Sequence, residues 1–370
     1  MGQRQSALEM VGLMRRAIDR SFWSGRRVLL TGHTGFKGGW MALMLEHLGA
    51  RVTGFALPPD TNPSLFEMLS PWPALASHTG DIRNAVAFGE VIIAARPEIV
   101  IHMAAQPLVR RSYAEPVLTF ETNVMGTMHL LEALRAVPTL QAALIVTSDK
   151  VYENHELGMA FAENAPLGSR DPYSASKAAA EILTRSYAHS FFACRKIPVA
   201  CARAGNVIGG GDWATDRLIP DLWRAYISRE QVVLRYPDAV RPWQHVLDPV
   251  FGYLLYVEHL VRREYDAPLA MNFGPPEAAV CAVRDVAEQF KRIMGSEGWR
   301  VGGADPNLKE NSYLAINASL ACETLGWESL LDVGKAIGWT LDWYKAFRDK
   351  KHMRNFSLQQ LVEYLRMACA

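Results

Sequence analysis

Several features that would mark a particular class of protein are scarce in this chain of 370 residues. Its five cysteines are odd in number, widely spaced and never arranged as C-x-x-C, which favours neither a disulfide framework nor a zinc site. No apolar run approaches the roughly 18 residues that cross a bilayer, and the N-terminal segment lacks the apolar core of a signal peptide. We therefore expect a protein of the reducing cytoplasm, with no metal centre and no membrane partner.

An excess of charge of either sign is also missing. Lysine and arginine number 39 against 38 aspartates and glutamates, so the formal net charge is only +1. Such a chain has no overall field that would attract nucleic acid, and any anion must be bound locally. Repeats and low-complexity tracts are absent from the sequence, and 49% hydrophobic residues suit one large or two moderate globular domains.

What the sequence does contain is a regular alternation of strand-like and helix-like segments. Strands are predicted at 26–30, 51–56, 97–102, 142–146 and 198–202, and helices at 40–48, 84–95, 122–136 and 172–191. This alternation predicts an α/β fold, a doubly wound parallel sheet of Rossmann type with helices on both faces.

Three parts of the chain are predicted, because the regular alternation of strands and helices is confined to one part of the sequence. An N-terminal extension at 1–24, in which 7–19 is compatible with an amphipathic helix, precedes a dinucleotide-binding domain at 25–205. That domain has a return segment near 240–272. Residues 206–370 form mainly a smaller mixed α/β lobe for substrate binding, which we expect to enclose a cleft with the first domain.

A glycine-rich turn follows the first predicted strand. Gly32, Gly35 and Gly38 form G-x-x-G-x-x-G between a strand and a helix. Glycine allows a tight turn and a close approach of the backbone to a diphosphate, which binds to the N–H groups at the helix N-terminus. The pattern predicts dinucleotide binding by Gly32, His33, Gly35, Phe36, Lys37 and Gly38.

The second predicted strand offers no acidic residue for the ribose hydroxyls, since it runs into Ala56-Leu57-Pro58-Pro59. No arginine stands there for a 2′-phosphate either, so the residues leave the choice between NAD and NADP open. Asp81 and Ile82 follow a further predicted strand and could contact the adenine, although a plain surface turn is an alternative.

Tyr173 and Lys177 stand at positions i and i+4 and therefore share one helix face. Of the twelve tyrosines only Tyr173 has a lysine four residues later. A nearby positive charge favours the phenolate, so Tyr173 could take a proton from a substrate hydroxyl while Lys177 reaches a nicotinamide ribose. The alternative is a solvated pair on a surface helix.

Thr147, Asp149 and Lys150 follow the apolar run 142–146 and so stand at the carboxyl end of a strand, where open parallel sheets bind ligands. Asp149 and Lys150 can serve as an acid and a base if burial keeps both neutral, whereas their proximity stabilises both charged forms. The sequence does not decide which effect is larger. A salt bridge that closes the strand is the structural alternative.

These motifs together resemble the extended short-chain dehydrogenase/reductase superfamily over residues 22–343. The resemblance is carried by GHTGFKG, HMAAQ at 102–106, Thr122-Asn123, TSDK, PYSASK, RAGNV, RPW at 241–243, NFG and LGW. It implies NAD as the cofactor, with further contacts from Ala104, Ala105, Gln106 and Asn123. It also implies self-association through the helices at 122–136 and 172–191, as a homodimer or homotetramer.

Within that superfamily, sugar-nucleotide 4,6-dehydratases typically place Thr-Asp-Glu where this chain has Thr147-Ser148-Asp149-Lys150, and the Asp-Lys version resembles members that act on CDP-glucose. The resemblance implies that Tyr173 starts oxidation at carbon 4 of the sugar, with Thr147 bonded to the reacting oxygen. Asp149 would then be the acid and Lys150 the base of an elimination across carbons 5 and 6.

The resemblance also implies a nucleotide-sugar substrate whose nucleotide is held by Asn206, Arg217 and Arg241, since arginine suits bidentate contact with phosphate. Arg217 is equally compatible with a charge on a helix surface. A sugar-nucleotide 4-epimerase or 4-ketoreductase would need Tyr173 and Lys177 but no acid–base pair, and a non-catalytic cofactor-sensing protein is a more distant alternative.

Overall fold

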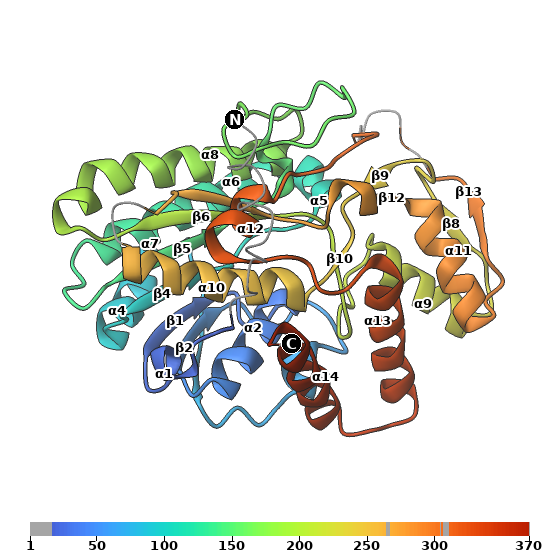
Figure 1. The fold of residues 1–370 in the computed structure, drawn as a ribbon, viewed down its shortest axis with the longest axis horizontal. Coiled ribbons are helices and arrows are strands. Elements are labelled where there is room, and N and C mark those ends of the chain that lie inside the picture. The colour runs from blue at the N-terminus through green and yellow to red at the C-terminus, as the bar shows by residue number, and fades with distance from the viewer. Residues whose placement is uncertain (1–16, 264–266, 304, 306–310, 370) are drawn as a thin grey trace, which may run out of the picture.

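The computed structural model describes residues 17–263, 267–303, 305 and 311–369. A parallel sheet of seven strands forms its centre, in the order β11-β6-β5-β4-β1-β2-β3 (Figure 1). The strands are β1 (Arg27–Thr31), β2 (Arg51–Ala56), β3 (Leu75–Thr79), β4 (Ile99–His102), β5 (Ala142–Val146), β6 (Val199–Ala204) and β11 (Ala270–Phe273). The predicted doubly wound fold is confirmed.

Strand order reverses beside β1, because the chain runs outward through β2 and β3 and then returns to β4 on the other side of β1. Thr31 at the end of β1 pairs with Phe55 on β2 and with His102 on β4. Loops that leave β1 and β4 therefore diverge to opposite faces of the sheet. In open α/β sheets this point of reversal opens a crevice for ligands.

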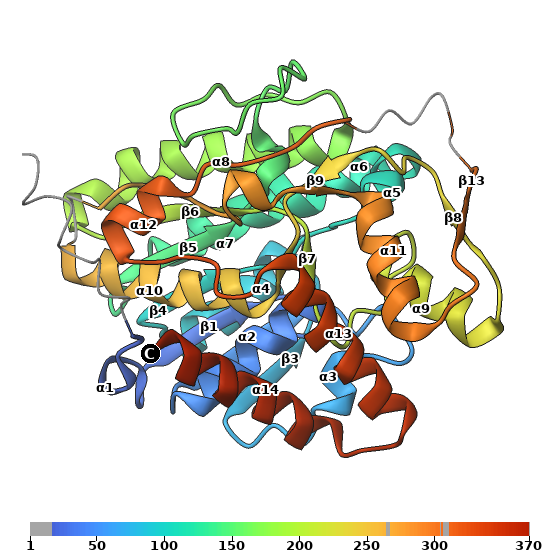
Figure 2. The same cartoon turned by 45° about the vertical axis from the view of Figure 1, so that its right-hand side comes forward.

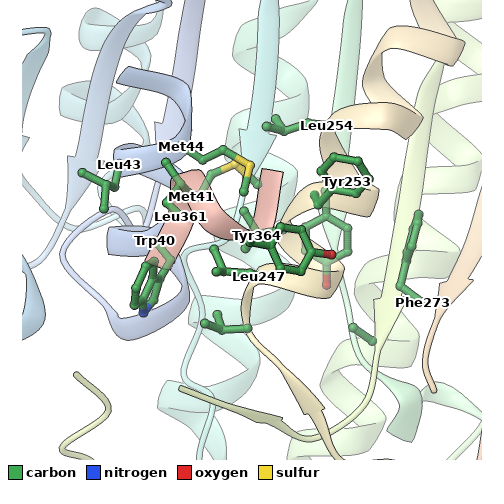
Figure 3. Close-up of a cluster of buried hydrophobic side chains, with 14 of the residues drawn as sticks. Trp40, Met41, Leu43, Met44, Leu247, Tyr253, Leu254, Phe273, Leu361 and Tyr364 are labelled. Atoms are coloured by element: carbon green, nitrogen blue, oxygen red, sulfur yellow. The ribbon is translucent and has the colours of Figure 1, made fainter. Parts of the chain in front are cut away.

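Alternate residues of the central strands face opposite helix layers. Leu30 and Ile101 belong to the core under one layer, whereas Leu29 and Val100 belong to the core under the other. The first layer contains α2 (Phe36–His47), α10 (Leu247–Arg263) and α14 (Met353–Ala368), whose side chains meet in Figure 3. The second contains α4 (Ala85–Ala95), α7 (Gly126–Leu134) and α8 (Pro172–Tyr187). Both faces are buried, which explains why the strands are continuously apolar.

The second lobe lies at one end of the sheet, on the right in Figures 1 and 2. Its strands form three pairs: β7 (Val207–Ile208) with β10 (Gln244–His245), β9 (Val240–Arg241) with β12 (Cys281–Ala282), and β8 (Val232–Leu234) with β13 (Trp299–Val301). Its helices are α9 (Leu218–Ser228), α11 (Val283–Met294) and α13 (Val333–Arg348). Short helices complete the chain: α1 (Arg20–Trp23), α3 (Leu65–Met68), α5 (Val109–Ala114), α6 (Pro116–Phe120) and α12 (Ser319–Leu325).

Two segments outside 25–205 pack on the sheet domain. β11 pairs in parallel with β6, so the edge of the sheet comes from the segment predicted to return. The indole N–H of Trp23 in α1 donates to Glu258 Oε1 of α10 at 2.9 Å, which ties the end of the predicted extension to this domain. The helix considered for residues 7–19 lies outside the described residues except for its last three positions.

Candidate active site

A cavity of about 720 Å³ opens at the carboxyl ends of the central strands, between the sheet domain and the second lobe. Most of the predicted site residues line it, although they come from six separate stretches of the chain. These are Gly32, Gly35, Phe36, Lys37, Gly38, Asp81, Ile82, Ala104, Ala105, Gln106, Thr147, Asp149, Lys150, Tyr173, Lys177, Asn206, Arg217 and Arg241.

The glycine turn is shaped so that only glycine fits at its two ends. Gly32 has φ of +74°, and a Cβ there would lie 2.7 Å from the backbone nitrogen of Ala104. A Cβ at Gly38 would lie 2.0 Å from the carbonyl oxygen of Gly32. Gly35 starts α2 without a side-chain cap, which leaves the N–H groups of the first turn for a ligand. These residues fit the diphosphate of a dinucleotide.

Two predicted cofactor residues do not line the cavity. His33 is fully buried beneath the turn, where Nε2 lies 2.7 Å from Ser77 Oγ and burial lowers its pKa to about 4. Asn123 is also buried, and its Oδ1 accepts from the backbone N–H of Gln106 at 2.8 Å while Nδ2 donates to Ser176 Oγ at 2.8 Å. Their side chains therefore support the wall of the cavity instead of forming it.

The far end of the cavity carries charges that the sequence did not reveal. Asp60, four residues beyond the end of β2, lines the cavity together with Arg83. Asp81 is bound by Arg83 with Nη2 to Oδ2 at 2.6 Å, and this hydrogen bonding lowers the pKa of Asp81. The sequence analysis did not predict Asp60, because only the residues directly after β2 were considered. Asp60 follows Pro58-Pro59 and lines the cavity.

Tyr173 and Lys177 lie on the first turns of α8, with Tyr173 9% and Lys177 7% exposed. Asp171 caps this helix by accepting from the backbone N–H of Ser174 at 2.9 Å, an interaction worth about 1 kcal/mol. Lys177 Nζ donates to the carbonyl oxygen of Val146 at the end of β5, at 3.1 Å. The cap and this contact fix the face of α8 that meets the cavity.

Burial is the largest cause of the pKa shifts of Tyr173 and Lys177. It raises the pKa of Tyr173 to about 12 and lowers the pKa of Lys177 to about 8. The groups that act to lower the pKa of Tyr173 are the Ser148 hydroxyl, by a hydrogen bond, and the Arg217 guanidinium. In this structure the phenolate is therefore favoured by Ser148 and Arg217, whereas the sequence argument relied on Lys177.

The hydroxyl that bonds to Tyr173 in this structure belongs to Ser148, whereas the resemblance implied Thr147 at the reacting oxygen. Thr147 Oγ1 donates to Glu181 Oε2 at 3.2 Å, on the face of the sheet that α8 covers. Neighbouring residues of an extended segment point to opposite sides, so only one of the two hydroxyls can face Tyr173. Ala143 and Ile145 face the helix layer that contains α8. Side chains alternate along a strand, so Thr147 is expected to face the same layer.

Glu181 was also missed, although it stands eight residues after Tyr173 on the same face of α8. It is fully buried and pairs with Arg203 of β6, whose Nε donates to Glu181 Oε2 at 2.9 Å. Through Thr147 and Arg203, Glu181 ties α8 to the ends of β5 and β6. Breaking one partner of such a buried pair is costly, so this anchor holds Tyr173 in register with the strand end.

Asp149 and Lys150 lie in the short 3₁₀ turn Asp149–Val151, with Ser148 as its cap. Lys150 Nζ lies 3.2 Å from Asp149 Oδ1 and 3.3 Å from Asn206 Oδ1. Asp149 is 1% exposed, and within the described chain its second oxygen, Oδ2, has no hydrogen-bond partner. Gly205 packs beside this carboxyl group, and a Cβ there would lie 2.5 Å from Pro242 Cγ and 3.2 Å from Oδ2.

The second lobe brings further charges to the cavity. Arg217 precedes α9 and binds Asp212 with Nη1 to Oδ2 at 3.0 Å, and Arg241 on β9 is 5% exposed. Asp216, Arg110 and Arg235, which the sequence did not single out, also line the cavity and are joined through the Asp216 carboxylate. Four arginines thus line the cavity against two carboxylates in this group, an excess of positive charge that suits an anionic ligand.

The fold and this cavity define a class of protein, a dinucleotide-dependent enzyme of the extended short-chain dehydrogenase/reductase superfamily, and the resemblance read from the motifs is confirmed. The sequence profile of the NAD dependent epimerase/dehydratase family matches residues 28–269. The chain belongs to that family.

Individual relatives support the same placement. The chain is 41% identical over 354 residues to a CDP-glucose 4,6-dehydratase of Salmonella typhimurium, covering 94% of this chain and 98% of the relative. It is 29% identical to a dTDP-glucose 4,6-dehydratase of Xanthomonas campestris, covering 85% and 92%. Among solved structures, a dTDP-glucose 4,6-dehydratase of Streptomyces venezuelae with NAD bound has a TM-score of 0.76 at 22% identity, covering 88% and 98%.

None of the described helices is both long enough and apolar enough to cross a membrane. All five cysteines are free thiols in this structure.

Proposed function

We propose that this protein is an NAD-dependent sugar-nucleotide 4,6-dehydratase, which converts CDP-glucose into CDP-4-keto-6-deoxyglucose and water. The observation that carries the proposal is Asp149, a buried carboxyl group that lines the cavity and has one oxygen without a hydrogen-bond partner among the described residues, beside Lys150 at the strand end. An enzyme that only moves hydride at carbon 4 has no use for this pair.

The glycine turn Gly32–Gly38 and Lys177 would hold NAD, which when bound supplies the acceptor and later the donor of one hydride. Tyr173 removes the proton from the hydroxyl at carbon 4, and the Ser148 hydroxyl stabilises the phenolate that this requires. The product of this oxidation is a ketone, which acidifies the proton at carbon 5. Lys150 is the base that removes that proton.

Asp149 then protonates the hydroxyl that leaves carbon 6 as water. Its Oδ2 is the oxygen suited to this transfer, because Oδ1 already accepts from Lys150 Nζ at 3.2 Å. Return of the hydride to carbon 6 and of a proton from Lys150 to carbon 5 completes the reaction, so the cofactor would end in the oxidised form in which it began.

The choice of CDP over another nucleotide rests on the relative from Salmonella typhimurium, at 41% identity over nearly the whole chain. Asn206, Arg217 and Arg241 are our candidates for contacts to the nucleotide diphosphate, because all three line the cavity near Lys150. A 4-keto-6-deoxy sugar nucleotide is a precursor of deoxysugars, and we place the enzyme in deoxysugar biosynthesis, including that of lipopolysaccharide O-antigens.

We further propose that two or four copies associate in the cytoplasm through the outer faces of the π-helical turn η1 (Glu121–Met125), α7 and α8. Ile182 on α8 is 56% exposed, and Met125 at the start of the α7 segment is 41% exposed. Nearby Val117 and Phe120 of α6 are 69% and 38% exposed. Exposed large apolar side chains gathered on neighbouring helices favour contact with a second copy.

The test of the activity is incubation with CDP-, dTDP-, UDP- and GDP-hexoses followed by mass spectrometry. We expect loss of one water from CDP-glucose. Conversion without loss of water would instead support a 4-epimerase or a 4-ketoreductase, and no conversion of any sugar nucleotide would leave only a cofactor-sensing protein.

A further inference from the structure

An ion-pair cluster on the wall of the cavity has no part in the chemistry proposed above. Asp216 lies two residues before α9, and its Oδ1 accepts from Arg235 Nη1 at 2.7 Å and from Arg110 Nη1 at 3.3 Å. Arg235 directly follows β8 in the second lobe, whereas Arg110 belongs to α5 of the sheet domain. All three residues line the cavity. The Asp216 carboxylate therefore joins the two lobes at the cavity wall.

The two arginines leave half of this carboxylate unused. Both contacts are made to Oδ1, and within the described residues no hydrogen bond reaches Oδ2. Asp216 has φ of +62°, in the left-handed region that aspartate and asparagine adopt more readily than most residues. A guanidinium group carries several N–H donors, so the contact with Asp216 does not exhaust those of Arg235. The cluster thus presents an acceptor and donors side by side.

The place of this cluster along the cavity follows from the charges around it. The charge of Arg217 acts on the pKa of Tyr173, so Arg217 lies toward the reaction centre. The charges of Asp216 and Arg235 act on the pKa of Asp221, which belongs to α9. A sugar nucleotide is a linear molecule with the sugar at one end and the base at the other. With its sugar at Tyr173 and its diphosphate at Arg217, its base would extend toward α9 and β8.

The surroundings of the cluster suit a nucleobase. Leu218 of α9, Leu234 of β8, Ala239 and Val283 of α11 also line the cavity, so apolar side chains accompany the polar group. A pyrimidine has apolar faces and one polar edge. On that edge cytosine carries an amino group at carbon 4, which donates, and N3 and O2, which accept. Uracil and thymine carry an accepting oxygen at carbon 4 and a donating N–H at N3.

We propose that Asp216 and Arg235 select cytosine as the base of the substrate, with Asp216 Oδ2 accepting from the amino group and Arg235 donating to N3 and O2. The inference rests on the proposed function, because it needs a sugar nucleotide in this cavity. Uracil and thymine would turn an oxygen toward the carboxylate and an N–H toward the guanidinium, so both contacts would become repulsive. A hydrogen bond to a charged group changes a binding constant by about ten- to a hundredfold.

The test is the dissociation constants of CDP and UDP, measured by calorimetry with the NAD-loaded enzyme. These two ligands differ only at carbon 4 and N3 of the base. We expect the wild type to bind CDP about ten- to a hundredfold more tightly than UDP. In Asp216→Asn this ratio should fall toward one, because an amide can turn its NH₂ group toward the O4 of uracil. Asparagine also tolerates the left-handed backbone at this position.

Two further variants complete the test. Arg235→Met should also lower the preference for CDP, since it removes the donor to N3 of cytosine and the repulsion of the N3–H of uracil. Asp342→Asn is the matched control for loss of one carboxylate, because Asp342 is an exposed residue of α13 that binds Lys345 at 3.4 Å. The ratio should stay at its wild-type value in this control.

Two results would overturn the inference. An unchanged ratio in both Asp216→Asn and Arg235→Met would remove these residues from base selection. An equal loss of affinity for CDP and UDP would instead make the cluster a contact to the phosphates or the ribose, which the two ligands share. Both results leave the dehydratase proposal intact, because loss of water from the sugar nucleotide is measured separately. A wild-type protein that binds no nucleoside diphosphate and removes water from no sugar nucleotide would refute the proposed function itself.

Discussion

Replacing Lys150 by methionine should separate the two halves of the proposed reaction. The amine at this position lies 3.2 Å from Asp149 and 3.3 Å from Asn206, and none of its contacts involves Tyr173 or Lys177. Oxidation at carbon 4 should therefore proceed in Lys150→Met. Removal of the proton from carbon 5 should slow by roughly a hundred- to ten-thousandfold, which is the usual contribution of one general base.

The substitution also removes the counter-ion of a buried group. The side chain of Lys150 is 21% exposed but that of Asp149 only 1%, so Lys150→Met leaves a buried carboxyl group, which protonation can neutralise. Methionine retains the packing of the stem. A variant that folds normally but cannot eliminate water is thus the expected outcome, and the thermal unfolding midpoint serves as the check.

The assay is a single turnover with CDP-glucose, followed by the absorbance of NADH. In the wild type the signal should rise and fall as the cofactor is recycled, whereas in Lys150→Met it should rise toward the enzyme concentration and persist. Formation of the 4-keto-6-deoxy product at an undiminished rate would refute the reasoning, because Asp149 and Lys150 would then be only a salt bridge that closes the strand.

Four further substitutions and one assembly measurement test the rest of the proposals. Tyr173→Phe should abolish formation of NADH in a single turnover while NAD binding persists, and a near-normal rate would remove Tyr173 from the chemistry. Asp149→Asn should stall with NADH accumulated, since an amide cannot protonate the leaving hydroxyl; release of product at the normal rate would contradict this. Ser148→Ala should raise the pKa of Tyr173 and slow oxidation at least tenfold at neutral pH, with the deficit shrinking as pH rises, whereas Thr147→Ser should change little; the reverse ranking in stopped-flow traces would restore Thr147. Sedimentation should show a dimer or tetramer at micromolar concentration and a shift toward monomer in Ile182→Asp, and a wild-type monomer would exclude the proposed interface.

The fold could be predicted because its signals are local. A strand such as 142–146 is apolar throughout because both faces of a parallel sheet are buried. The spacing of Gly32, Gly35 and Gly38 is set by the geometry of one turn, and the four-residue spacing of Tyr173 and Lys177 by the period of one helix. These relations hold wherever the segments fold, so the sequence suffices to state them.

The candidate site was predictable only as far as those local relations reach. Thr147 and Ser148 are adjacent hydroxyls, and only the packing of Thr147 against Glu181 assigns Ser148 to Tyr173. Asp149 and Lys150 form a pair in the sequence, but only the tertiary structure shows that Lys150 also contacts Asn206, more than fifty residues later, and that Asp149 Oδ2 has no hydrogen-bond partner among the described residues.

The sequence by itself determined which chemical groups this protein brings to a strand end and how the groups within one turn or helix are spaced. Only the tertiary structure decided that His33 lies beneath the turn and that the ammonium of Lys37 reaches Tyr253. It also decided that the pKa of Tyr173 lies near 12, because burial dominates that value. The physical reason is that desolvation and hydrogen bonding depend on neighbours that the chain supplies from distant segments, and no local spacing specifies those neighbours.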